Sequence, residues 1–81
     1  MDASTRAFID LLDQINREAG FAILHGGDEL RLCIEEYNDI YDRLSREKTE
    51  IAYRFSRLAT DVSAGSLRMT VRDMIHFLEY E

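Results

Sequence analysis

The stretch that decides the fold reads DELRLCIEEYNDIYDRLSREKTEIAYRFSRLATDV, residues Asp28–Val62, and it contains neither glycine nor proline. Its apolar residues recur at alternating steps of four and three, the spacing that keeps one side of a long helix facing a partner helix. We call these positions the seam, which Lys48 alone interrupts with a charge: Leu30, Ile34, Tyr37, Tyr41, Leu44, Lys48, Ile51, Phe55, Leu58 and Val62. The pattern predicts one long central helix over residues 28–62, roughly 50 Å at ~1.5 Å per residue.

The weakest part of this central helix is the segment Ser45–Thr49. Polar residues dominate it, and its seam residue is Lys48. A break there would divide the long helix into two shorter ones. Because the segment holds no helix-breaking glycine or proline, we expect the helix to continue through it.

A shorter amphipathic helix is predicted before the central one, over about residues 4–24. Its apolar residues fall on one side, as expected of a helix that packs against a core. Gly20 is one place where this helix could end. The pair Gly26 and Gly27 is the firmer stop, because paired glycines interrupt helices strongly.

The last helix is predicted over about residues 66–80, after the small and polar linker Ser63–Ser66. Ser66 could cap it directly, or Thr70 could cap it after a short extended lead-in. The chain is then expected to be a single all-α domain over residues 1–81. It would be a three-helix chain with one long central helix and a bundle or coiled-coil-like core.

Two arrangements would cover the seam. In the first, the outer helices fold back on opposite halves of the central helix and give a monomeric bundle. In the second, the central helix pairs with a second copy of itself. Charge favours an antiparallel homodimer, because Glu35 and Glu36 would then face Arg57 of the other chain. We therefore expect homodimerisation to complete the fold, with Lys48 near the two-fold axis setting the register.

The composition indicates a folded protein of the cytoplasm. No apolar run approaches the ~20 residues of a membrane span, and the start of the chain does not resemble a signal peptide. The one cysteine, Cys33, excludes an internal disulfide and fits a reducing compartment.

The negative charge of the chain lies in its first half. Residues 1–42 hold ten acids against three bases, whereas residues 43–81 hold six acids against seven bases. An acidic half argues against direct nucleic-acid binding and against binding to anionic membranes, since a basic surface supplies most of that affinity. It fits a protein partner with a basic surface.

Two groups of residues are candidates for binding such a partner. Four acids form an exposed strip beside the seam, and two aromatic residues lie off the buried stripe of the last helix. The predicted partner-binding residues are Glu35, Glu36, Asp39, Asp42, Phe77 and Tyr80. A plain solvated face is the simpler interpretation of the acidic strip.

The side chains that an enzyme needs are not assembled in this sequence. No glycine-rich phosphate loop is present, and Cys33 beside the seam is interpreted as a small buried hydrophobe. Asp73 and His76 have the spacing of a carboxylate-bridged metal site, but the further inward-facing carboxylates of such a site are missing. We expect no enzymatic activity, no cofactor and no bound metal.

The sequence thus favours a non-enzymatic helical interaction module, a small adaptor or regulator that binds another protein. One alternative is an acidic inhibitor that blocks the nucleic-acid-binding surface of its partner, as anti-CRISPR and DNA-mimic inhibitors do. A second alternative is a small DNA-binding transcriptional regulator. This second alternative is disfavoured, because Arg68 and Arg72 are the only bases in or near the last helix.

Overall fold

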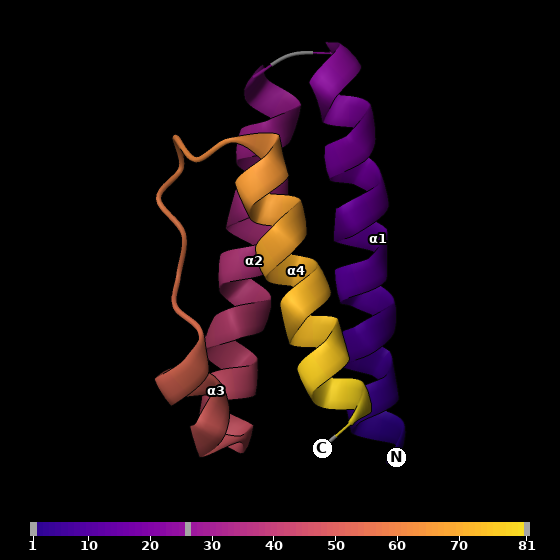
Figure 1. The fold of residues 1–81 in the computed structure, drawn as a ribbon, viewed down its shortest axis with the longest axis vertical. Coiled ribbons are helices and arrows are strands. Elements are labelled where there is room, and N and C mark those ends of the chain that lie inside the picture. The colour runs from indigo at the N-terminus through magenta and orange to yellow at the C-terminus, as the bar shows by residue number, and fades with distance from the viewer. Residues whose placement is uncertain (1, 26, 81) are drawn as a thin grey trace.

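Four helices make up the computed structural model of the chain, which describes residues 2–25 and 27–80 (Figure 1). They are α1 (Ala3–His25), α2 (Gly27–Glu47), α3 (Thr49–Arg54) and α4 (Ala64–Glu79). No strand occurs within the described ranges, so the predicted all-α class is confirmed. Within the same ranges, no helix combines the length and the apolar character that crossing a membrane requires.

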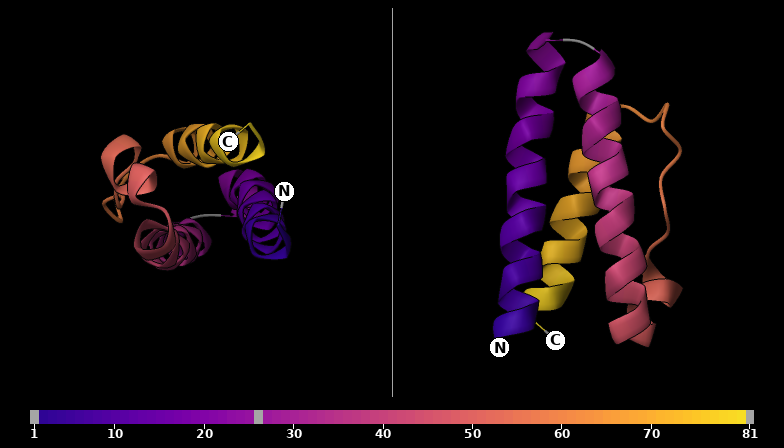
Figure 2. Two further views of the ribbon diagram at one scale, coloured as in Figure 1. Left: turned by 90° about the horizontal axis from the view of Figure 1, so that it is seen from below. Right: turned by 180° about the vertical axis from the view of Figure 1, so that it is seen from behind.

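Helices α1 and α2 form an antiparallel hairpin, and α4 packs against both of them (Figure 2). The predicted apolar stripe of each helix faces the space between the three. Nine side chains there are the largest fully buried ones: Leu12, Ile15, Ile34, Tyr37, Leu44, Ile51, Leu67, Val71 and Met74. Because burying one such apolar side chain stabilises a fold by about 1.5–3 kcal/mol, this core is the main source of stability.

The predicted continuity of the central helix over 28–62 is wrong. Helix α2 ends at Glu47, and Lys48 has an extended backbone with φ −131° and ψ 104°. Helix α3 then adds only Thr49–Arg54 before Phe55 becomes extended, with φ −129° and ψ 169°. The described residues therefore form four helices rather than three, and the break falls inside the polar segment that was the weakest part of the prediction.

Residues 55–63, which we call the strap, run back along α2 to the start of α4 (Figure 1). The seam residues of the strap, Phe55, Leu58 and Val62, are half-buried and pack against the core. A continuous helix would carry these three side chains beyond the hairpin, where a single chain has nothing to cover them. Tertiary burial thus outweighs helix continuity, as is usual because isolated helices are only marginally stable.

Helix α4 begins earlier than either predicted start. Ser63 caps it, and the Ser63 Oγ accepts a hydrogen bond from the backbone N–H of Ser66 at 3.1 Å. Ser66 and Thr70, the two residues predicted as caps, both lie inside the helix. The longer helix allows Leu67 to reach the core.

The hairpin connection and the outer ends of the chain lie at opposite ends of the molecule. Helix α1 ends at His25 and α2 begins at Gly27, while Gly26, one of the two glycines predicted as the stop, lies outside the described residues. The first turn of α1 and the last turn of α4 lie together at the other end (Figure 1). The longest extent of the fold is 35 Å.

Candidate interaction surfaces

The predicted acidic strip is only partly available to a partner. Glu35, Glu36 and Asp39 are exposed on α2. Asp42 is half-buried, and its carboxylate forms an ion pair with Arg57 of the strap. Asp42 therefore helps to fix the strap, and three of the four predicted acids remain as exposed carboxylates.

The two predicted aromatic residues differ in exposure. Phe77 is half-buried, with its ring edge-on to Phe55 at 6.0 Å between centroids and the Arg54 guanidinium 5.1 Å above it. Tyr80 is exposed, and its ring stacks on His76 at 6.0 Å. Both residues line an open hollow of about 800 Å³ between α3 and α4. Although Phe77 lies off the buried stripe of the last helix, it is half-buried because Arg54 and Phe55 cover its ring.

The residues predicted to form the dimer seam are used inside one chain. Ile34, Tyr37, Leu44 and Ile51 are completely buried, and Leu30, Tyr41, Phe55, Leu58 and Val62 pack against them. Lys48 is half-buried at the break between α2 and α3. The apolar seam residues thus belong to the core of a single chain or pack against it.

An apolar surface that was not predicted from the sequence lies at the hairpin end, which we define as the last turns of α1 and the first turns of α2. Four large apolar side chains are exposed there by 55–78%: Phe21, Ile23, Leu24 and Leu32. Helix α4 has 16 residues and α1 has 23, and α4 begins below the last turn of α1 and the first turn of α2 (Figure 1). The hairpin end therefore projects beyond the helix that covers the rest of the hairpin.

A shallow hollow of about 210 Å³ lies between α1 and α2 at this end. We call it the hairpin groove, and its lining residues are Glu18, Phe21, Glu29, Leu32, Cys33 and Glu36. Phe21 and Leu32 supply the exposed apolar walls. Its acidic lining residues are the three glutamates, so the hollow combines an apolar floor with an acidic rim.

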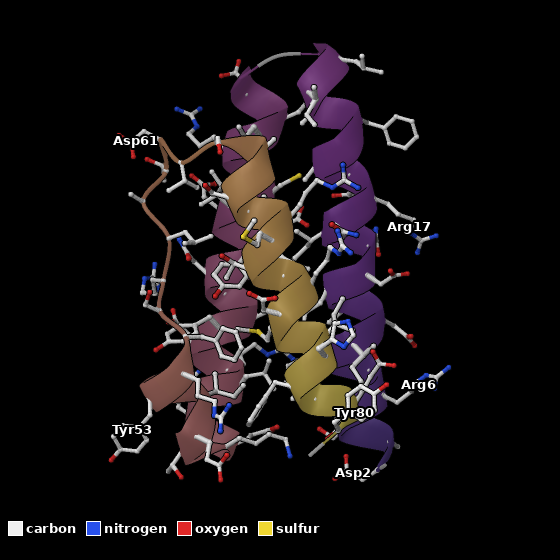
Figure 3. All side chains as sticks on the ribbon, in the orientation of Figure 1. Asp2, Arg6, Arg17, Tyr53, Asp61 and Tyr80 are labelled. Carbon is white, nitrogen blue, oxygen red and sulfur yellow. The ribbon has the colours of Figure 1, made fainter. Side chains whose placement is uncertain are left out.

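The hairpin groove faces away from α4. On α1, the side chain of Asn16 accepts a hydrogen bond from Arg68 Nε of α4 at 3.2 Å, and a Cβ added at Gly20 would lie 3.6 Å from the same guanidinium. Glu18 is two residues from both, which places it about 200° around the helix from each of them. Figure 3 shows side chains projecting from the outer sides of α1 and α2, away from the packed interior.

Cys33 forms part of the floor of the groove and is buried, as predicted. Its thiol donates a weak hydrogen bond to Glu18 Oε2 at 4.0 Å. Burial raises the pKa of the Cys33 thiol, and the charge of Glu18 raises it further. The thiol is therefore protonated at neutral pH and behaves as a small apolar group.

Glu36 stands at the opposite rim of the groove. Partial burial raises the pKa of its carboxyl group, and the charges of Glu18 and Asp39 raise it further. The ion pairs of Arg6, Arg17, Arg31 and Arg57 are made with other acids, Asp10, Asp13, Asp28 and Asp42. A cation placed at the rim would relieve the mutual repulsion of the three glutamate carboxylates.

The described residues offer no assembled metal site, since no group of three His, Cys, Asp or Glu side chains lies close enough to hold an ion. Asp73 and His76, the pair with metal-site spacing, instead line the open hollow beside Tyr80. No protein-family model matches the chain, and neither a curated protein nor a solved structure matches it.

Proposed function

We propose that the protein is a non-enzymatic interaction module that binds another protein through its hairpin end. The observation that carries this proposal is the group of four large apolar side chains exposed at one end of the fold: Phe21, Ile23, Leu24 and Leu32. Single exposed apolar residues are common on proteins, but neighbouring ones often mark a binding site. Covering each side chain would contribute up to about 1.5–3 kcal/mol to binding.

The internal packing of the hairpin does not require these side chains. Ala19 and Ala22 already fill the inner side of the last turns of α1, where both are buried. On α2, Cys33 and Ile34 are buried beside the exposed Leu32. Shorter polar residues at the outer positions would therefore satisfy the fold equally well, which supports a role in binding.

A second proposal is the acidic inhibitor that covers a basic, nucleic-acid-binding surface of its partner. Its support is the exposure of Glu35, Glu36 and Asp39 on one helix. Charge reversal at Glu35 and Asp39, which do not line the hairpin groove, separates the two proposals. It would weaken inhibition of a nucleic-acid-binding protein, whereas the fold would persist because both side chains are exposed.

The homodimer stays a proposal in a changed form. Because Ile34, Tyr37 and Leu44 are buried by the chain's own helices, a second copy could reach them only after the strap detaches. We therefore propose that the closed chain acts as a monomer and that seam pairing belongs to an opened state. We also propose a reducing compartment such as the cytoplasm, with Cys33, the one cysteine, as support.

The interaction is tested by comparing variants in a cross-linking capture from the source cells. Leu24→Ser/Leu32→Ser removes two apolar groups from the hairpin end. Tyr53→Ser is the matched control, because Tyr53 is 88% exposed on α3, away from that end. Wild type and control should capture the same protein, and the double variant should lose it while its circular dichroism is unchanged. Capture of identical proteins by all three chains would contradict the proposal.

A further inference from the structure

We infer that the hairpin groove receives a cationic amphipathic helix from the partner, with one large apolar side chain between Phe21 and Leu32 and basic side chains beside the three glutamates. This inference rests on the proposed function and names the chemistry of the partner.

The hollow is suited to one anchoring side chain. Its volume of about 210 Å³ is smaller than the ~300–1,000 Å³ of pockets that enclose a whole drug-sized ligand. Its walls come from two helices, with Phe21 on α1 and Leu32 on α2. A leucine or phenylalanine seated there would be covered on both sides, as the central anchors of helical interfaces are.

The charge around the hollow selects a basic partner. Glu29 and Glu36 lie on either side of Leu32 along α2, and Glu18 faces them from α1. Glu29 and Glu36 are two turns of helix apart, about 10.5 Å. Lysines or arginines one turn before and one turn after the anchor of a bound helix would match this spacing. Such rim pairs contribute to partner choice and association rate more than to raw affinity.

A helix fits this surface better than an extended peptide does. An extended peptide gains its affinity from hydrogen bonds to an open sheet edge, and the described part of the chain contains no strand. The hairpin groove instead is lined by residues of two helices, α1 and α2. Figure 2 shows that α4 covers one side of the α1–α2 hairpin. A bound helix would pack along the groove and complete a four-helix arrangement.

A second copy of the chain is a poor occupant of the same groove. Pairing two hairpin grooves would bring Glu18, Glu29 and Glu36 of one copy against the same three residues of the other. Like charges set opposite one another oppose association. An anionic membrane surface would be repelled by the same carboxylates.

The inference is tested with synthetic helical peptides as probes. Each has about 18 residues, roughly five turns, with leucines on one side. Lysines flank the leucines in the first peptide, glutamines replace them in the second and glutamates in the third. We expect wild type to bind the lysine peptide about tenfold more tightly than the glutamine peptide, and the glutamate peptide least. The preference should shrink at high salt, because rim charges are screened.

Protein variants locate the binding site. Leu32→Ser should weaken binding of the lysine and glutamine peptides alike by about tenfold, by removing an apolar wall of the hollow. Glu29→Gln/Glu36→Gln should remove the preference for lysine while leaving binding of the glutamine peptide unchanged. Glu47→Gln/Glu50→Gln, at exposed positions near the α2–α3 break, is the matched control and should behave as wild type.

Several outcomes would overturn the inference, and they are distinct from failure of the proposed function. Equal affinity for the three peptides would show that the groove does not select charge. Unchanged binding by Leu32→Ser, or no binding of the lysine peptide to wild type, would show that a cationic helix does not occupy this groove. The proposed function would still be decided by the capture experiment with Leu24→Ser/Leu32→Ser, which uses no synthetic peptide.

Discussion

Asn38 on α2 holds Leu58 of the strap through two hydrogen bonds. The Asn38 side-chain nitrogen donates to the Leu58 carbonyl oxygen at 3.0 Å, and the Leu58 N–H donates to Asn38 Oδ1 at 2.8 Å. Asn38 is only 5% exposed and Leu58 is half-buried, so these bonds are partly shielded from water. One side chain thus satisfies both backbone groups of a residue that lies outside any helix, and this explains why the strap follows α2.

Replacement of Asn38 by alanine should detach the strap. The change leaves the N–H and the carbonyl of Leu58 without their partners, which costs about 1–3 kcal/mol of unfolding free energy. Urea denaturation measures that cost, and amide hydrogen exchange at Leu58 should become faster. Gln14→Ala is the control, because Gln14 makes only an exposed bond to Glu18 within α1. A loss below ~0.5 kcal/mol, the range of ordinary surface substitutions, would contradict this role of Asn38.

Tyr37 should make the fold sensitive to alkaline pH. Its hydroxyl donates to the Ser56 carbonyl oxygen at 2.9 Å, and burial raises the pKa of Tyr37 above its usual range. The folded state therefore keeps its proton at a pH where the unfolded chain loses it. The contribution of protonated Tyr37 to the free energy of unfolding is fully present below the unfolded-state pKa of about 10. It is lost as the pH rises beyond that value.

Denaturation of Tyr37→Phe as a function of pH tests this expectation. The variant should lose about 1 kcal/mol at neutral pH, for the missing hydrogen bond, and should show a smaller alkaline loss than wild type. Tyr53→Phe, at an exposed position, should follow the wild-type profile. An alkaline profile of Tyr37→Phe identical to that of wild type would show that Tyr37 is not the responsible group.

Release of the strap should change the oligomeric state. Asn38→Ala/Leu58→Ser removes both the polar and the apolar attachment of the strap, which exposes part of the seam and allows pairing with a second copy. Sedimentation equilibrium should give a monomer for wild type at micromolar concentration and a concentration-dependent dimer for the double variant. A wild-type dimer would mean that pairing does not need an opened strap.

Replacement of Gly20 by alanine should stabilise the protein. Gly20 lies within α1, where glycine costs about 0.5–1 kcal/mol relative to alanine because it loses more backbone freedom on folding. A methyl group there would meet the Arg68 guanidinium at 3.6 Å, an ordinary contact distance. Thermal denaturation should show a higher midpoint for Gly20→Ala. A lower midpoint would show that Arg68 cannot accommodate the methyl group.

The periodicity of the sequence predicted burial better than it predicted backbone conformation. Phe55, Leu58 and Val62 were correctly placed among the residues that contact the core, but the strap carries them there rather than a helix. Spacing alone cannot distinguish a helix from an extended strap. It shows which side chains must be buried, but it does not show which backbone conformation buries them. The polar segment around Lys48 was the one local sign of a break.

The hairpin end could not be predicted because its exposure depends on where α4 stops. Phe21, Ile23 and Leu24 form an apolar run, and such a run is equally compatible with a buried last turn. Only the packed fold shows that α4 leaves this end of the hairpin uncovered. The run does carry one sign of exposure. Its apolar side chains point to several sides of the helix, and a single core can cover only one side.

The shared location of the first turn of α1 and the last turn of α4 governs how the module can be tethered. Any polypeptide fused to either terminus would emerge at the end of the fold opposite the hairpin connection (Figure 1). With a longest extent of 35 Å, the fold would hold the exposed apolar side chains well clear of such an attachment. A tag, a surface anchor or a neighbouring domain could therefore orient the module with its hairpin end pointing outward.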